Sequence, residues 1–205
     1  MKVLSTLLPL LALSESDEIG EKKLSETMKM VYDQVTTTLD FQTFTNRLQN
    51  YGCHCFPNNS RIPGGKGEWQ NPVDLACKRL AQCNQCVGLD HADFVDAQDK
   101  YRWETVNGAI DCSANNEDDK RDHCQCDKEF ALQMGMVWND NDFDTSVWFN
   151  RRNQDAQVYD DVCVQNVVNP PTSEKECCGE NPKRRPYNVD VFECCQDGSI
   201  RINCP

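Results

Sequence analysis

Cysteine and histidine side chains in two short segments have the spacing of a metal site. Cys83 and Cys86 form a CxxC pair, and "HCQC", His123 to Cys126, could complete a four-ligand zinc centre. In an oxidising compartment the same thiols would instead be consumed in disulfide bonds. The compartment therefore decides which chemistry these residues do.

The N-terminal residues indicate export. Met1 and Lys2 are followed by "VLSTLLPLLAL", an apolar run too short to span a bilayer, and small residues suit signal cleavage before Glu15. No later segment approaches the roughly 20 apolar residues of a membrane span, so no transmembrane segment is expected. We therefore predict a secreted, extracellular protein whose thiols form disulfides rather than a zinc site.

The cysteine count favours a disulfide scaffold. Of 14 cysteines in 205 residues, eight lie from Cys53 to Cys126 and six from Cys163 to Cys204. These two even sets predict a main domain and a smaller C-terminal module, each closed by its own bridges. The adjacent pairs at 177–178 and 194–195 should each bond to two different partners, because neighbouring cysteines rarely bond each other. The predicted bridge-forming residues are Cys53, Cys55, Cys77, Cys83, Cys86, Cys112, Cys124, Cys126, Cys163, Cys177, Cys178, Cys194, Cys195 and Cys204.

Three segments show helical spacing of their apolar residues and would have to position any site. The first runs from Leu24 to Leu48 and should break at the β-branched Thr36 to Thr38. The second is residues 73–101, and the third is residues 114–134, which could run back beside the second. A glycine-rich loop lies before the second segment.

Three features together resemble the secreted phospholipase A2 family: "YGCHC" from Tyr51, the glycine-rich "GGKG", and "HCQCD" ending at Asp127. The likeness covers residues 39–136. It implies a mainly α, disulfide-rich fold with two antiparallel cross-linked helices and a calcium-binding loop, to which a small cysteine-rich C-terminal module is added. It also places Asp127, which in that family helps to hold the catalytic histidine, and Tyr101 among the catalytic-site residues.

The family's catalytic pair is missing from the helix after the loop. Ester hydrolysis by this route needs a general base, a carboxylate that orients it and a cation at the developing oxyanion. The family supplies base and calcium ligand with an HDxC motif. If Cys86 takes the motif's cysteine position, Cys83 and Asn84 replace the pair; if Cys83 takes it, Leu80 and Ala81 do. Both alignments favour an inactive member, and an active enzyme would need a displaced base.

The loop itself resembles the family's calcium loop. Carbonyls of Gly64, Gly65 and Gly67 would bind calcium, weakly, because the helix carboxylate that would be the strongest ligand is absent. The insertion "FPNNSRIP" makes the loop longer than the family's, and it carries a glycosylation sequon at Asn58. A glycan there would need an exposed loop.

The C-terminal cysteines resemble a second family. "CCGENPKRRPYNVDVFECCQDGSI", from Cys177, is similar to one unit of the galaxin-type di-cysteine repeat of extracellular and skeletal matrices. A generic disulfide knot that caps the main domain is the equal alternative. We predict a signal peptide at 1–14, a phospholipase A2-like domain at 15–138, an acidic linker at 139–162 and a galaxin-like module at 163–205.

The net charge of −12 argues against a nucleic-acid partner, because phosphate contacts need clustered basic residues. It favours cations, basic partners or mineral. We expect a non-catalytic protein that binds calcium, a phospholipid surface, or an extracellular or biomineral matrix. The alternatives are an active calcium-dependent phospholipase A2, which hydrolyses the sn-2 ester with His91, His54 or His123 as a displaced base, and a toxin-like module that binds a receptor.

Overall fold

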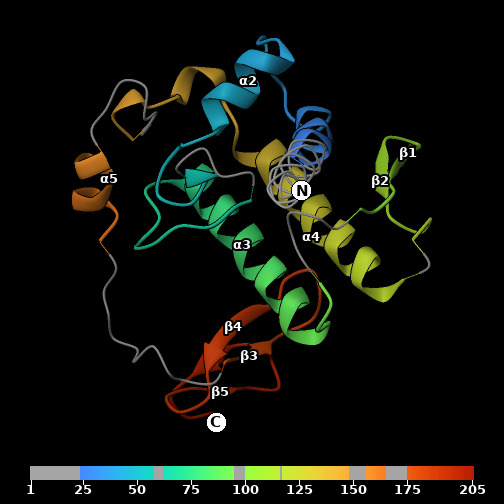
Figure 1. The fold of residues 1–205 in the computed structure, drawn as a ribbon, viewed down its shortest axis with the longest axis vertical. Helices are drawn as coiled ribbons and strands as arrows, with labels where there is room; N and C mark the ends of the chain where they lie inside the picture. Colours follow the sequence, from blue (N-terminus) through green and yellow to red (C-terminus); the bar gives the residue numbers. More distant parts are fainter. Residues whose placement is uncertain (1–23, 58–61, 95–99, 116, 148–155, 165–174) are drawn as a thin grey trace, which may run out of the picture.

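The computed structural model describes residues 24–57, 62–94, 100–115, 117–147, 156–164 and 175–205. Two long helices form its centre: α3 (Pro72–Asp90) and α4 (Asp118–Val137) lie antiparallel and side by side (Figure 1). The Cys83–Cys126 disulfide joins them near their middles. The predicted mainly α, disulfide-rich fold with two antiparallel cross-linked helices is therefore confirmed.

The start of α3 follows from its sequence. Asn71 is the N-cap and its side chain accepts a hydrogen bond from the backbone N–H of Asp74, while Pro72 occupies the first turn, where its missing N–H costs nothing. The helix ends at Asp90 because His91 has an extended backbone. The helical pattern expected over residues 73–101 is therefore interrupted, and His91 lies just outside the helix.

The N-terminal region contains two short helices. The first covers residues 24–32 within the described part, and α2 (Phe41–Leu48) follows after an irregular stretch, so the predicted break at Thr36–Thr38 is confirmed. The carboxylate of Asp40 caps α2 by accepting from the backbone N–H of Thr43. Of the helices formed by the described residues, none is long and apolar enough to cross a bilayer.

These helices bury one apolar core against α3 and α4. Phe44 of α2 packs edge-on against Trp138, which follows α4, with the ring centroids 4.6 Å apart. Phe130 and Met134 of α4 are at most 2% exposed in the same core. Burial of aromatic and aliphatic side chains of this size fixes how α2 lies on α4.

The β-structure consists of three small antiparallel pairs. β1 (Glu104–Val106) pairs with β2 (Ala109–Asp111) through an Asn-Gly turn in which both residues have positive φ. In the C-terminal region β3 (Lys175–Cys178) pairs with β4 (Arg185–Asn188), and β5 (Glu193–Cys194) with β6 (Ile200–Arg201). Figure 1 shows β3, β4 and β5 below the C-terminal end of α3.

All fourteen cysteines are paired, but the two sets do not close separately. Three bridges lie within the first set, Cys55–Cys77, Cys83–Cys126 and Cys112–Cys124, and two within the second, Cys178–Cys194 and Cys195–Cys204. Cys53–Cys163 and Cys86–Cys177 join one set to the other. The expectation of two self-contained sets is therefore wrong. Cys163, directly after α5 (Ala156–Val162), lies beside the start of the glycine-rich loop, and Cys177 lies beside α3. The adjacent cysteines do bond to different partners, as predicted.

The acidic stretch after α4 is tied to the N-terminal region. It forms the short helix η2 (Asp140–Asp142), and η3 (Thr145–Val147) follows. The carboxylate of Asp140 accepts hydrogen bonds from the Thr37 hydroxyl, the Thr38 backbone and hydroxyl, and the Trp138 indole. Burial alone would raise the pKa of Asp140, but these hydrogen bonds outweigh it and hold the pKa far below its ordinary value. Asp140 therefore anchors the start of the stretch that was predicted as an acidic linker.

Candidate functional site

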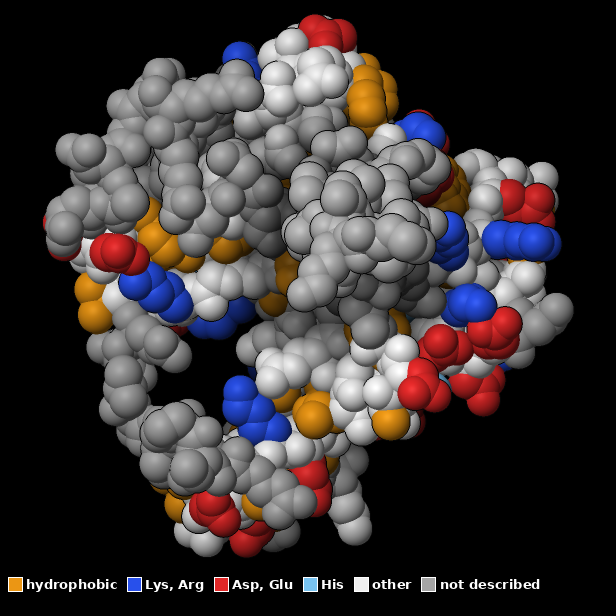
Figure 2. Space-filling model, viewed as in Figure 1, with side chains coloured by type: hydrophobic (Ala, Val, Ile, Leu, Met, Phe, Trp, Pro, Cys, Tyr) orange, Lys and Arg blue, Asp and Glu red, His pale blue; other side chains and the backbone are white. Residues whose placement is uncertain are grey.

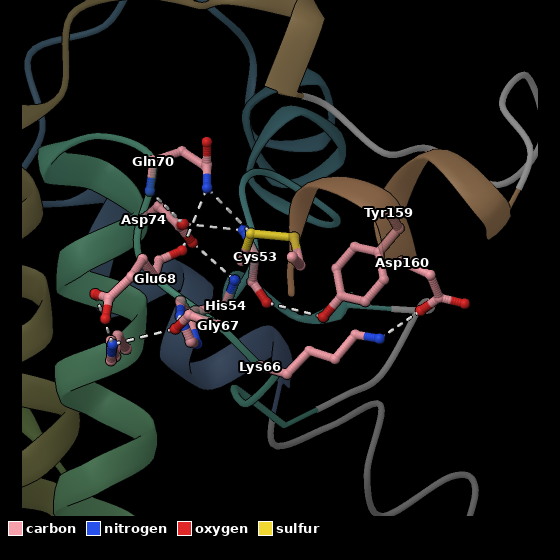
Figure 3. The surroundings of a disulfide bond; sticks show 11 residues. Cys53, His54, Lys66, Gly67, Glu68, Gln70, Asp74, Tyr159 and Asp160 are labelled. Carbon is pink, nitrogen blue, oxygen red and sulfur yellow. Dashed lines mark hydrogen bonds and ion pairs between the residues drawn. A yellow bond between two sulfur atoms is a disulfide. The ribbon is translucent and has the colours of Figure 1, made fainter. Parts of the chain in front are cut away.

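The glycine-rich loop is held by the buried carboxylate of Asp74, in the first turn of α3 (Figure 3). Its Oδ2 accepts hydrogen bonds from the backbone N–H groups of Cys53 and Gln70, both at 2.9 Å, and its Oδ1 accepts from the N–H of His54 at 2.7 Å. Both oxygens are thus occupied by donors from the two ends of the loop. The carboxylate acts as a clasp that closes the loop onto the first turn of α3.

Gly52 makes this clasp sterically possible. Its φ of +61° lies in the left-handed region, and a Cβ at this position would lie 2.2 Å from the Asp74 carboxyl carbon. Only glycine has both the required backbone freedom and the required space.

The carbonyl of Gly67, one of the three predicted calcium ligands, faces a cation of the protein itself. The Lys78 ammonium donates a hydrogen bond to Gly67 O at 3.2 Å and lies 3.6 Å from a carboxylate oxygen of Glu68. His54 Nε2 lies 3.2 Å from the same carbonyl. Burial lowers the pKa of His54, and the nearby Asp74 carboxylate only partly opposes that shift.

These contacts do not fit a calcium site. Calcium requires six to eight oxygen ligands, carboxylates among them. Gly67 O already accepts from an ammonium group, and the Asp74 oxygens accept from three backbone N–H groups. Gly64 and Gly65 lie in the same loop, and a Cβ on Gly65 would meet the Cys53 carbonyl oxygen at 1.9 Å, so the backbone is closely packed there. In the described ranges, no group of three or more histidine, cysteine or acidic residues is placed to hold a metal ion.

The outer side of the loop is covered by α5. The Tyr159 hydroxyl donates to the Cys53 carbonyl at 3.0 Å, and Lys66 pairs with Asp160 at 2.6 Å (Figure 3). The Cys53–Cys163 disulfide fastens the end of α5 beside these contacts. Loop and α5 therefore form one cross-linked unit.

On α3, the position of the missing base has no titratable side chain in either alignment. Cys83 is 3% exposed and its sulfur is bonded to Cys126, while the adjacent Asn84 is 4% exposed. In the other alignment the position holds Leu80, which is buried and apolar, followed by Ala81. A cystine sulfur and an aliphatic side chain are both unable to accept a proton from water.

The structure does bring Asp127 and Tyr101 together. The Tyr101 hydroxyl and the Thr27 hydroxyl both donate to Asp127 Oδ2, the latter at 2.9 Å, and Asp127 is only 1% exposed. This network links α4, the segment before β1 and the N-terminal helix. Thr27 was not expected in it, because no local pattern relates a residue to a partner 100 positions away.

The three histidines lie in three different environments. His123 is fully buried, with its ring edge-on to Phe94 and to Tyr101 at centroid distances of 4.9 and 5.1 Å. His54 is 5% exposed under the loop. His91 is the most accessible and pairs with Asp122 at 3.2 Å, beyond the end of α3.

Sequence reasoning missed Asp74 and Lys78, although a signal for both was present. Asn71 and Asp74 occupy the N-cap and third positions of a helix start, where a polar residue and an acidic residue are expected. Lys78 follows Asp74 by four residues and so lies on the same helix face. For Tyr159 the sequence offers no such signal. The predicted signal peptide and the sequon at Asn58 lie outside the described residues.

No protein family model matches the chain. It is 34% identical over 82 residues to the group IID secretory phospholipase A2 of Mus musculus, a match that covers 40% of this chain and 51% of that one. It is 30% identical over 112 residues to the basic phospholipase A2 DsM-S1 of Daboia siamensis, covering 55% and 70%. It is also 29% identical over 121 residues to the acidic phospholipase A2 homolog taipoxin gamma chain of Oxyuranus scutellatus scutellatus, covering 50% and 76%. The chain thus spans about half the length of the mouse relative.

Proposed function

This chain belongs to the secreted phospholipase A2 family, and we propose that it is a secreted, non-hydrolytic member that acts by binding a phospholipid surface. The observation that carries the proposal is the Cys83–Cys126 disulfide between α3 and α4. In one alignment it occupies the position of the general base, and in the other that position holds Leu80. Hydrolysis needs a base within hydrogen-bond reach of a water, and neither side chain is one.

The cation that the reaction needs is also unsupported. The Gly67 carbonyl accepts from Lys78, so a divalent ion there would have to displace an ammonium group that lies beside Glu68. A metal that stabilises the oxyanion is the second requirement of the reaction. The lack of a base on α3 and the occupied Gly67 carbonyl in the loop therefore both support a non-hydrolytic protein.

A displaced base is the alternative, and the surroundings of the histidines weigh against it. His123 is fully buried, and His54 lies under the loop with its ring against Gly67 O, so neither is open to a substrate. His91 is accessible but lies outside α3 and pairs with Asp122. The matrix-binding and receptor-binding alternatives stay predictions, and no contact in the described residues favours either of them.

The test is fatty-acid release from phospholipid vesicles by the oxidatively folded protein, with calcium and with chelator. We expect no release above buffer in either condition, together with co-sedimentation of the protein with the vesicles. An active phospholipase A2 in the same assay is the positive control. Chelator-sensitive release that is lost in Asp127→Asn would overturn the proposal, and absence of vesicle binding would remove the phospholipid surface as partner.

A further inference from the structure

A groove of about 410 Å³ lies where the C-terminal strands approach α3 and α4. Its volume is within the range of about 300–1,000 Å³ that is common for small-molecule sites. Asp127 and Tyr101 do not line it, so it is separate from the network described above. The residues that line it are Ala76, Arg79, Leu80, Cys83, Cys126, Glu129, Phe130, Gln133, Met136, Pro182, Lys183, Arg184 and Arg185.

The part of the groove formed by the two helices is apolar. Leu80, Phe130 and the Cys83–Cys126 disulfide are each at most 3% exposed. Met136, six residues beyond Phe130 on α4, is 76% exposed and extends the apolar surface outward. A hydrocarbon chain laid on this floor would itself leave water and would also cover Met136, which is favourable in proportion to the apolar area buried.

The rim is basic, although the protein as a whole carries a net charge of −12. Lys183 lies 3.8 Å from Glu129, and Arg184 pairs with Asp90. Arg79 and Arg185 are both exposed, and within the described ranges neither has an acidic partner within 4 Å. Figure 2 shows Lys or Arg side chains next to hydrophobic ones over β3 and β4. Arg79 donates one hydrogen bond to Gln133 at 3.4 Å. Each guanidinium carries five N–H donors, so both keep donors for an anion at the edge of the apolar floor.

The walls of the groove are fixed to each other. The Cys86–Cys177 disulfide joins α3 to β3, and the Arg184–Asp90 pair joins the start of β4 to the end of α3. Asn181 also donates to Asp122 of α4 at 2.9 Å. Because these links hold the basic rim above the helices before any ligand arrives, binding would cost little ordering of the protein.

We infer that this groove binds a single-chain anionic amphiphile, such as an alkyl carboxylate. The charged head contacts Arg79 and Arg185, and the chain lies on Leu80, Phe130 and the disulfide. Guanidinium groups suit a carboxylate because they form charge-assisted, bidentate hydrogen bonds. An acidic peptide would leave the apolar floor uncovered, and a flat membrane would not enter a concave groove. The inference does not depend on whether the chain hydrolyses esters.

The test is calorimetric titration of the folded full chain with dodecanoate below its micelle concentration. We expect saturable one-to-one binding that the double variant Arg79→Glu/Arg185→Glu weakens at least about tenfold, since two charge-assisted contacts are lost and repulsion is added. The matched control, Lys100→Glu/Arg102→Glu, makes the same charge change at two exposed positions away from the groove and should bind as the wild type does.

Three further measurements separate the sources of any binding. Met136→Asp, at a position exposed enough to tolerate the change, should also weaken dodecanoate, whereas acetate should not bind and dodecanol should bind more weakly than dodecanoate. The inference would be overturned if the groove variant and the control variant lost the same dodecanoate affinity, or if the wild type showed no saturable binding of dodecanoate. Loss of binding to phosphatidylserine vesicles in the groove variant without any binding of monomeric dodecanoate would also overturn it, because the rim would then be a membrane-docking surface.

Discussion

The clasp formed by Asp74 predicts a large and local loss of stability when its carboxylate is removed. In Asp74→Ala, the backbone N–H groups of Cys53 and His54 lose their acceptor in a place where both residues are at most 5% exposed. Gln70 is exposed, so its N–H can turn to water. With about 1–3 kcal/mol for each buried donor left unsatisfied, the free energy of unfolding should fall by about 4 kcal/mol.

Asp74→Asn should cost less, about 1–3 kcal/mol, because one amide oxygen can still accept while the amide nitrogen faces a donor. The control is Asp111→Ala, which removes a carboxylate that also accepts a backbone N–H, from Ser113, but on the exposed side of a turn. It should cost no more than about 1 kcal/mol.

Guanidinium unfolding with intact disulfides measures the three variants, and unchanged m-values would show that the same surface is exposed on unfolding. Hydrogen exchange at the Cys53 and His54 amides should accelerate in Asp74→Ala more than exchange in α4 does. If Asp74→Ala lost no more stability than Asp111→Ala, or if the two amides kept their protection, the carboxylate would not be what closes the loop.

Removing the hydroxyl of Tyr101 with Tyr101→Phe should lower the free energy of unfolding by about 1–3 kcal/mol, because buried Asp127 loses a donor. Tyr187→Phe, whose hydroxyl bonds to Glu176 at the surface, should change it by less than about 0.5 kcal/mol in the same denaturation assay. Burial lowers the pKa of His54, so the unfolded chain binds the proton first, and stability should fall as the pH drops below about 6.5 and level off below the folded-state pKa. The melting temperature of the wild type should fall as the pH drops below about 6.5, and that of His54→Gln should not show this fall. Because Lys78 already donates to Gly67 O, the melting temperature should be equal in millimolar calcium and in chelator, and a rise of more than about 2 °C with calcium would contradict this.

The helices could be predicted from the sequence because their signals are local. The spacing of apolar residues, Pro72 at a helix start and the β-branched run at Thr36–Thr38 each act within one or two turns. The hairpin of β1 and β2 was missed although Asn107-Gly108 carries a strong local turn signal. Its strands have only three residues each and no alternation to mark them.

The bridges between the two cysteine sets could not be predicted. Which cysteines meet is decided by how the chain returns after α5, and the two bridges that join the sets close separations of 110 and 91 residues. The same limit applies to the Thr27–Asp127 and Tyr159–Cys53 contacts, which are 100 and 106 residues apart. The absence of the His-Asp pair could be seen in the sequence. The contact of Lys78 with the Gly67 carbonyl could not, because it depends on how Asp74 holds the loop against α3.

The glycine-rich loop and α3 differ from a hydrolytic phospholipase A2 site in a similar way. In each, a group that hydrolysis would need for a metal ion or a proton is engaged in a contact within the protein. A carbonyl that would serve a metal ion accepts from Lys78, and a helix position that could hold a base carries a cross-link to α4. Both contacts stabilise the scaffold: the lysine donates to a partly buried carbonyl, and the disulfide restricts the unfolded chain. The cysteines that fasten the C-terminal strands to the loop and to α3 act in the same direction. The cross-links to the C-terminal region make the scaffold rigid where the basic groove lies, and a rigid groove binds a ligand with little loss of conformational freedom.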